Sequence, residues 1–339
     1  MSQPGKKVTM SDIASTLGIS KNSVSLALNS KTGVSNDLRR RIIDTARSMN
    51  YGVFSAQGGS RSKCILVIVP EYLFNDVFFY AEVFWAIENE AKSMGFLSVS
   101  AGITKEMENG MILPAMPTEM DILGLLVIGV LQKEYIIKLK QTGLPMLSVD
   151  IAYSGLDVGW VGSANLSGGY LATKHLINQG HRRLGFIGSI FFAESIYERY
   201  CGFMRVMMAY GLTITPDFNI LGARENPVLF DTVPALEPYF ANIKELPDAW
   251  FCAGDRIAVA LINILTQKGM RVPGDVSVIG FDDIPMSQLV LPTLTTMRID
   301  RKLMGKLALD AVINSRQDYR QNISITVDMV ERDSVREMH

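Results

Sequence analysis

From Cys64 to the end of the chain, short apolar segments alternate with segments of helical periodicity, and this alternation is what most limits the fold. The first apolar run, 64–69, is continuous, as in a strand that is buried on both faces of a sheet. The helical segments end at glycines such as Gly95, Gly143 and Gly180, which adopt the left-handed conformation without steric cost. Repeated strand–helix units predict parallel, doubly wound sheets, and two successive series predict two similar lobes.

The pattern also predicts where the elements lie. We expect strands over 64–69, 97–101, 125–129, 145–150, 184–188, near 218–221, 249–253, 276–281 and 323–330. We expect helices over 78–94, 132–142, from after Val161 to Gln179, 194–210, 233–246, 255–268 and 301–314. The first lobe should then comprise about 64–163 and 284–298, and the second about 164–283 and 299–339. The segments 284–298 and 299–339 are thus assigned to different lobes.

The segment 9–29 reads as two short helices around a tight turn. Thr9 can cap the first helix in a capping box with Asp12, and Gly18 can end it. Ser20 can cap the second helix, whose outer face carries polar, non-acidic side chains at positions 21, 22, 25 and 29. A helix-turn-helix of this form places its second helix in the major groove of DNA. A small amphipathic pair that only packs a core is the alternative.

Charge favours the DNA-binding interpretation. A third helix is expected after Ser35, and it carries three consecutive arginines at positions 39–41. Residues 1–63 contain ten Lys and Arg against three acidic residues, a net charge of +7. Because the whole chain has a net charge of −1, residues 64–339 have −8. A basic head joined to an acidic body is typical of a duplex-binding module attached to another domain.

The N-terminal motif V-T-M-S-D-I-A-S-T-L-G-I-S-K-N-S-V-S-L-A-L-N resembles the headpiece of the LacI/GalR family of bacterial transcriptional regulators. The resemblance continues through 168–188, 272–284 and 291–297, so it covers nearly the whole chain. It implies a three-helix headpiece over 1–51, a hinge over 52–63, and a two-lobed effector-binding and dimerisation domain over 64–339. The implied function is ligand-responsive repression of a carbohydrate-utilisation operon through a palindromic operator.

The hinge departs from the family pattern. In the family this segment forms a short helix on operator DNA and wedges a leucine into the minor groove. Here Ser60 occupies the matching position, Gly58 and Gly59 precede it, and Val53 replaces a proline near the hinge start. Each glycine costs about 1 kcal/mol in a helix interior, so ordering of this segment is expected to be weak.

The DNA-binding residues follow from the headpiece motif. We expect Lys21 and Asn22 to read base edges, because ammonium and amide groups pair with guanine and adenine. Ser25, Arg39 and Arg41 should serve mainly phosphates, and Leu26 could contact a thymine methyl group or simply pack. The full predicted set is Thr9, Ser20, Lys21, Asn22, Ser23, Ser25, Leu26, Asn29, Ser35, Arg39 and Arg41.

In doubly wound sheets, ligands bind beyond the carboxyl ends of the strands, which here marks 70–80, 188–199, 254–256 and 282–283 together with Asp150. The family binds its effector, often a sugar or nucleobase, between two lobes with the same loops. Carboxylates, an arginine fork and aromatic rings in such a site favour a polyhydroxylated ligand. Matched by motif, the effector-binding candidates are Phe79, Tyr80, Asp150, Ser195, Arg199, Arg256 and Asp282.

Two of these assignments have structural alternatives. Asp282 and Asp283 could cap the turn that follows them, and Arg199 could pair with Glu194 or Glu198 at the surface.

The identity of the ligand is also open. Gly254 stands where relatives commonly carry a ligand-binding asparagine, and Arg301 replaces a frequent aromatic residue. Together with Arg256 these residues predict a pocket more cationic than usual, which leaves room for a sugar phosphate or an acid beside the sugar and nucleobase alternatives.

Other functional classes have no support in the sequence. Phosphate-binding, nucleophile and metal-binding motifs are missing, so we expect no enzyme, no metal and no cofactor. A sugar-binding receptor without a DNA role would lack the basic head. The absence of a signal peptide or an apolar span, and three widely spaced cysteines, indicate a cytoplasmic protein without a membrane partner. A single headpiece reads one half-site, so a homodimer on double-stranded operator DNA is expected.

Overall fold

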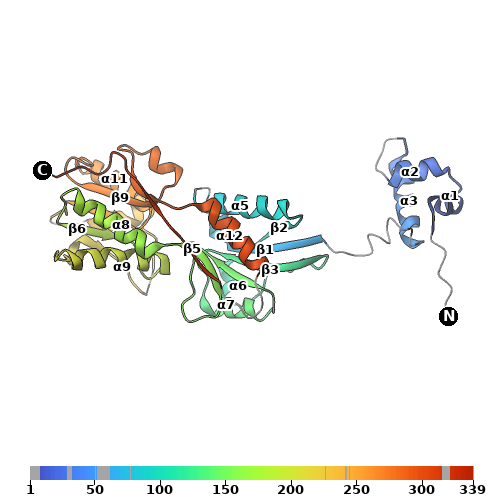
Figure 1. Ribbon diagram of the computed structural model, residues 1–339, viewed down its shortest axis with the longest axis horizontal. Coiled ribbons are helices and arrows are strands. Elements are labelled where there is room, and N and C mark those ends of the chain that lie inside the picture. The colour runs from blue at the N-terminus through green and yellow to red at the C-terminus, as the bar shows by residue number, and fades with distance from the viewer. Residues whose placement is uncertain are drawn as a thin grey trace. The chain divides into compact units, whose positions relative to one another are not determined.

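The computed structural model describes residues 8–28, 33–49, 51, 62–76, 78–225, 227–240, 243, 245–314 and 321–338, without the side chains of residues 36, 47 and 75. The chain divides into two compact units, Met1–Ser62 and Lys63–His339 (Figure 1). The first unit contains a helical headpiece, and the second contains two α/β lobes. Of the predicted hinge over 52–63, residues 52–61 lie outside the described residues, and residues 62 and 63 already belong to a strand.

The headpiece consists of α1 (Met10–Leu17), α2 (Lys21–Leu28) and α3 (Asn36–Ser48). The predicted capping box is present, because Thr9 N–H donates to Asp12 Oδ2 at 2.7 Å and Asp12 N–H donates to Thr9 Oγ1 at 3.4 Å. Gly18 ends α1 with φ of 65°. The hydroxyl oxygens of Ser20 and Ser35 accept N–H groups in the first turns of α2 and α3. The predicted helices and their N-caps are confirmed.

A small apolar core holds the three headpiece helices together. Ile13 of α1, Val24 of α2 and Ile42 of α3 have no solvent exposure, and Ala27 and Ala46 fill the space between them. Each helix therefore buries one stripe and leaves the opposite face free, as the helical periodicity of the sequence requires.

The first lobe is a six-stranded sheet in the order β11–β5–β4–β3–β1–β2. The register between β1 and β2 is parallel and aligns Leu66 with Val99. Alternate residues of β1 face opposite helices: Ile65 and Val67 pack with α5 and α12, whereas Leu66 and Ile68 pack with α7. The strands are β1 (Ser62–Pro70), β2 (Leu97–Ile103), β3 (Met120–Ile128), β4 (Met146–Val149), β5 (Gly159–Ser163) and β11 (Asn322–Ile325), and the helices are η1 (Glu71–Asn75), α5 (Tyr80–Ser93), α6 (Lys105–Asn109), α7 (Lys133–Lys140) and α12 (Arg301–Ile313).

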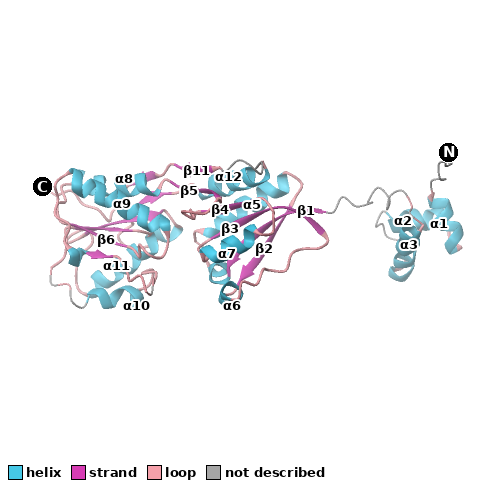
Figure 2. Ribbon diagram, turned by 90° about the horizontal axis from the view of Figure 1, so that it is seen from below, coloured by secondary structure: helices cyan, strands magenta, loops and turns pink. Residues whose placement is uncertain are grey.

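The second lobe repeats this plan with the order β12–β10–β9–β8–β6–β7. Helices α8 and α9 lie on one side of the sheet, and α10 and α11 lie on the other (Figure 2). Strand β12 runs antiparallel to β10, whereas the other pairs of neighbouring strands described in this sheet are parallel. The strands are β6 (Leu184–Ile187), β7 (Asn219–Ile220), β8 (Ala249–Cys252), β9 (Ser277–Asp282), β10 (Thr295–Arg298) and β12 (Asp328–Val330), and the helices are α8 (Asn165–Asn178), α9 (Glu194–Ala209), η2 (Pro216–Phe218), α10 (Val233–Leu236), η3 (Glu237–Phe240), α11 (Asp255–Gln267) and η4 (Pro285–Gln288).

The predicted division of the C-terminal segments between the lobes is wrong. The chain crosses between the lobes after β5, after β10 and after β11. Strand β10 therefore belongs to the second lobe, whereas α12 and β11 belong to the first. Apolar side chains of α12 pack with α5 in one core, which fixes the helix to the first lobe. For the same reason the single strand predicted over 323–330 is two strands in different sheets.

Two other elements differ from expectation. The helix predicted over 233–246 is only α10 followed by the 3-10 turn η3, because Pro238 lacks the N–H that would continue the α-helix. Strand β5 precedes α8 where only the helix was expected, and it joins the first sheet beside β4.

Within the part of the chain that the structure describes, no helix has both the length and the apolar character needed to cross a bilayer.

Candidate functional site

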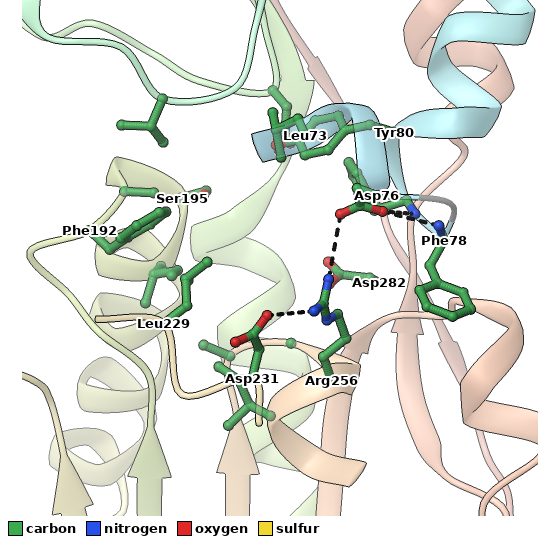
Figure 3. A pocket seen from close by; sticks show the side chains of 18 of the residues that line it. Leu73, Asp76, Phe78, Tyr80, Phe192, Ser195, Leu229, Asp231, Arg256 and Asp282 are labelled. Atoms are coloured by element: carbon green, nitrogen blue, oxygen red, sulfur yellow. Dashed lines mark hydrogen bonds and ion pairs between the residues drawn. The ribbon is translucent and has the colours of Figure 1, made fainter. Parts of the chain in front are cut away.

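A cavity of about 160 Å³ lies between the two lobes of the second unit (Figure 3). Most of its wall comes from segments that follow the carboxyl ends of β1, β3 and β4 in the first lobe and of β6, β8 and β9 in the second. This is the position at which open parallel sheets bind ligands. The lining residues are Tyr72, Leu73, Asp76, Phe78, Phe79, Tyr80, Val130, Asp150, Ile151, Phe192, Ala193, Ser195, Ile196, Arg199, Leu229, Asp231, Ala253, Gly254, Arg256, Ile257, Asp282 and Ile284.

The structure brings all seven predicted effector residues to this one cavity. Phe79, Tyr80 and Asp150 line it from the first lobe, and the other four line it from the second. The predicted segments 70–80 and 254–256 also contribute lining residues that the motif comparison did not single out.

Arg199 is the most highly connected of the seven. It lies on α9, is only 5 % exposed, and its guanidinium carbon lies 3.7 Å from the ring centroid of Phe281. Nε donates to Asn165 Oδ1 at 2.9 Å, and Nη1 donates to the carbonyl of Ala253 at 2.5 Å and to Asp282 Oδ1 at 3.1 Å. Arg199 thus pairs with Asp282 and not with Glu194 or Glu198. Its Nη2 has no hydrogen-bond partner among the described residues and remains available to a ligand.

Asp150 faces Arg199 from the first lobe. It directly follows β4 with φ of 70°, a backbone conformation that costs a non-glycine residue about 1–3 kcal/mol and often marks functional sites. The Tyr80 hydroxyl donates to Asp150 Oδ2 at 3.0 Å, whereas Oδ1 is buried without a partner in the described structure. Burial raises the pKa of Asp150, while the charge of Arg199 and the Tyr80 hydrogen bond lower it. Burial, followed by the charge of Asp150, raises the pKa of Tyr80 well above its usual value.

Asp282 ends β9 and is the second carboxylate at the centre of the cavity. Its φ is 110°, again a left-handed conformation. Burial, and to a smaller extent the charge of Asp150, raises the pKa of Asp282 to about 7 against the opposing charge of Arg199. Gly254 lies beside it, and a Cβ at Gly254 would stand 3.3 Å from Asp282 Oδ2. The absence of a side chain at position 254 therefore keeps this carboxylate oxygen open.

Arg256 connects the two lobes across the cavity. Its Nη2 lies 2.8 Å from Asp231 Oδ2 in the second lobe, and its Nη1 lies 3.8 Å from Asp76 Oδ2 in the first (Figure 3). Asp76 is itself held by the N–H groups of Phe78 and Phe79, which donate to its Oδ1. The arginine is thus neutralised by two carboxylates.

The expected cationic character of the pocket is wrong. Four aspartates and two arginines line the cavity, so acidic groups predominate. Arg301 does not line it: Nε donates to Glu82 at 2.6 Å, and the two Nη atoms donate to the backbone carbonyls of Asp282 and Asp283. Arg301 of the first lobe therefore supports the end of β9 in the second lobe from behind the site.

Asp283 has a structural role, but not the predicted alternative of capping the turn that follows it, since η4 begins after Ile284 without a side-chain cap. Its carboxylate accepts hydrogen bonds from Arg298 at 2.7 Å, Arg332 at 2.6 Å and Ser287 at 3.1 Å. These partners belong to the second lobe, and the side chain is absent from the cavity wall. The two neighbouring aspartates 282 and 283 thus differ in function, one lining the cavity and one tying the lobe together.

Sequence reasoning missed Asp76, Asp231 and most of the aromatic wall. Asp76 and Phe78 lie in a segment that the strand-end rule had marked, so their region was available from the sequence. Asp231 lies in the long segment after β7, where neither a motif nor a strand end points to it. Its pairing with Arg256 arises only from the fold.

In the headpiece, the predicted DNA-binding residues divide into exposed and structural groups. Lys21 and Asn22 are exposed at the start of α2, and Arg41 is exposed on α3. Thr9, Ser20 and Ser35 are engaged as N-caps, and Ser23 shares the hydrogen bonds of Ser20. Ser25 and Leu26 are half-buried, and Asn29 lies outside the described residues.

Arg39 has a structural contact as well as a predicted phosphate role. Its Nη1 donates to the carbonyl of Ala27 at 3.0 Å and to that of Leu26 at 3.4 Å. A cation at this position satisfies the last carbonyls of α2 and fixes that helix against α3.

Two sequence families match the chain. A family described as bacterial regulatory proteins of the lacI family matches residues 9–52, and a periplasmic binding protein-like domain matches residues 173–335. Among curated proteins, the HTH-type transcriptional repressor PurR of Haemophilus influenzae is 29 % identical over 345 residues, which cover 97 % of this chain and 98 % of that protein. The PurR repressor of Aliivibrio salmonicida is 28 % identical over 338 residues, with coverage of 97 % and 99 %.

Solved structures share the fold at lower identity. A Lac repressor dimer bound to operator and the anti-inducer ONPF superposes with a TM-score of 0.70 at 22 % identity, covering 98 % of this chain and all of that one. A complex of the transcriptional regulator CelR with cellobiose gives 0.69 at 22 % identity, with coverage of 97 % and 100 %. A lacI-family regulator from Enterococcus faecium with bound ribose gives 0.65 at 22 % identity, with coverage of 81 % and 100 %.

Proposed function

Since the chain belongs to the lacI family of bacterial regulatory proteins, we propose that it represses transcription from a palindromic operator, and that a small sugar-type effector in the inter-lobe cavity controls operator binding. Its relatives are transcriptional repressors and regulatory proteins. Like them, the chain is a ligand-responsive DNA-binding regulator and not an enzyme. The observation that carries the effector assignment is the convergence of seven predicted residues on one cavity between the lobes.

A sugar fits the chemistry of the cavity. The free oxygens of Asp150 and Asp282 accept hydrogen bonds from hydroxyl groups, and Arg199 Nη2 and the Ser195 hydroxyl offer donors. The aromatic side chains can cover the apolar face of a ring. Two structural relatives hold cellobiose and ribose, which supports the same class here.

The aromatic wall favours a second effector class, a nucleobase. Tyr72, Phe78, Phe79, Tyr80 and Phe192 all line the cavity, and a planar ring with both donors and acceptors would satisfy the same polar groups. A sugar phosphate or another acid is disfavoured, because four aspartates face the ligand and the two arginines are already paired.

A thermal-shift screen of the full chain against sugars, nucleobases and sugar phosphates tests the proposal, followed by operator binding with each hit. Asp282→Ala and Arg199→Ala should abolish the effector response while operator affinity stays near wild type. Phe79→Ala should weaken the response less, because ring stacking contributes less than a charged hydrogen bond. If either charged-residue variant responds at the wild-type effector concentration, the cavity is not the effector site.

A further inference from the structure

The charge balance of the cavity is unusual for a site that holds a neutral molecule. Its wall contains Asp76, Asp150, Asp231 and Asp282 against Arg199 and Arg256. The N-termini of α9 and α11 also face it without a side-chain cap, and each contributes about half a positive charge. With every carboxylate ionised, about one negative charge remains uncompensated.

The excess charge can be assigned to one residue. Arg256 lies between Asp76 and Asp231, and Arg199 donates to Asp282, so three of the four carboxylates have a cation. Asp150 has none within ion-pair distance in the described structure. It is 8 % exposed, and its Oδ1 has no hydrogen-bond partner. Burial of an ionised carboxylate in this state is costly unless the group is protonated or a bound group supplies the missing donor.

The surroundings of Asp150 fit a cationic donor. Tyr80 donates to Asp150 and packs edge-to-face with Phe79 at 4.9 Å between ring centroids. Carboxylates combined with aromatic faces are typical of sites that bind ammonium groups. The cavity of about 160 Å³ is close to the roughly 150 Å³ that holds a benzene molecule, so a single ring fits within it.

We propose that the effector is a single-ring compound that bears a protonated amine, such as an amino sugar, and that its ammonium group binds Asp150. The inference rests on the proposed function, since it names the ligand class of the same cavity. The ring would lie against the aromatic wall, and its hydroxyl groups would reach Asp282 and Arg199.

Protonation of the cavity carboxylates makes the binding of an amine depend on pH. Burial raises the pKa of Asp150 and raises that of Asp282 to about 7. Arg199 and Arg301 lower the pKa of Asp282, and the buried Asp255 lies close enough for its own pKa to be raised by Asp282. A bound ammonium favours the ionised carboxylates, whereas at low pH it must compete with their protons. Affinity for an amine should therefore rise as pH increases toward 7.

Isothermal titration calorimetry of the full chain with matched pairs of amino sugars and parent sugars tests the proposal. Glucosamine, galactosamine and mannosamine are compared with glucose, galactose and mannose, because each pair differs mainly in an ammonium group that replaces a hydroxyl. Glucuronate and glucose 6-phosphate serve as anions. We expect at least one amino sugar to bind with a Kd about tenfold or more below that of its parent sugar, which is the effect of one charge-assisted hydrogen bond, and the anions to bind most weakly.

Two variants test whether Asp150 is the residue that gives the preference for the amine. Asp150→Asn keeps the shape of the side chain and should remove the preference for the amine. Glu198→Gln changes a half-buried carboxyl group whose pKa is raised by burial and, to a smaller extent, by Asp150. Glu198 does not line the cavity, so this variant should leave the preference intact. The affinity of the amine, but not that of the neutral sugar, should increase from about pH 5.5 to about pH 7 in the wild type.

A neutral parent that binds as tightly as its amine, a preference that survives Asp150→Asn, or no binding of any amino sugar would overturn the inference. The proposed function depends on a different measurement, the effect of a cavity ligand on operator affinity. It stands if a neutral molecule occupies the cavity and changes operator affinity, and it falls if a cavity ligand of any class leaves operator affinity unchanged.

Discussion

Asn22 is an exposed amide in the first turn of α2, the helix expected to enter the major groove. Bidentate hydrogen bonding to adenine would give it a role in sequence choice. Asn22→Ala should therefore cost about 1–3 kcal/mol on the preferred operator and relax its sequence preference, with little change on random DNA.

Arg41→Ala provides the contrast, because this exposed arginine on α3 is expected to contact phosphates only. It should weaken binding to both kinds of DNA and reduce the salt dependence. Fluorescence anisotropy on selected and random duplexes separates the two effects. Equal losses on both duplexes for Asn22→Ala would show that the residue does not read bases.

The raised pKa of Asp282 has a consequence for stability. Because its pKa rises from 3.8 to about 7 on folding, the folded state binds more protons than the unfolded state between these values. The contribution of this carboxyl group to stability should therefore fall as pH increases from about 4 to about 7.

Asp282→Asn removes that titration. In the absence of ligand, the Tm of the variant relative to wild type should rise across this pH range. Asp275→Asn is the control, since Arg271 holds the pKa of this half-buried carboxyl group at about 2, so it remains ionised throughout. A Tm difference for Asp282→Asn that stays constant from pH 4 to 7 would show that Asp282 is ionised in the free protein.

For individual residues, the sequence predicted where the site lies more accurately than it predicted the interactions of the side chains within it. The strand-end rule and the family motif identified Arg199 and Asp282 because both depend on position along the chain. Charge compensation depends on partners from distant segments, which is why Arg256 and Arg301 were misjudged as free cations. Asp231 joins Arg256 only after the long segment following β7 folds back over the second lobe.

Helices α8 and α9 pack with a close backbone approach near the site. A Cβ at Gly169 would lie 2.2 Å from the carbonyl oxygen of Arg199, and one at Gly202 would lie 2.3 Å from that of Leu166. Glycines at the crossing therefore set the distance between the helices and the position of the Arg199 backbone.

Gly169→Ala should destabilise the protein by about 1–3 kcal/mol, since backbone atoms cannot move aside cheaply. The Tm should fall by about 2–4 °C for each kcal/mol. Effector affinity should also fall, because Arg199 must shift. Leu171→Ala on the same helix removes a side chain that is 44 % exposed and should change neither quantity. An unchanged Tm and affinity for Gly169→Ala would mean that the helices separate without cost.

Elements with strong periodicity and a defined end could be predicted from the sequence, among them α1, α5, α9 and α11. The three short strands near the C-terminus could not. Strands β10, β11 and β12 have only three or four residues each, and the sheet that each joins is decided by where the chain crosses between lobes. Periodicity carries no information on that choice, and so the lobe assignment of the C-terminal segments failed.

For the whole molecule, we predict a homodimer. One headpiece reads one half-site, and the two-fold symmetry of a palindromic operator requires a second copy. Light scattering at micromolar concentration should give twice the chain mass of 37.5 kDa. A stable tetramer or a persistent monomer would contradict this prediction.

We propose that a single chain couples a ligand in the inter-lobe cavity to operator DNA. The direct measurement is the operator Kd of the full chain on a palindromic duplex selected from random sequence, with and without a saturating cavity ligand. We predict a change of about fivefold or more in the wild type, the usual range of allosteric coupling, and none for Asp282→Ala, which should still bind the operator. An operator Kd that stays the same in the wild type, while calorimetry shows the cavity occupied, would contradict the account.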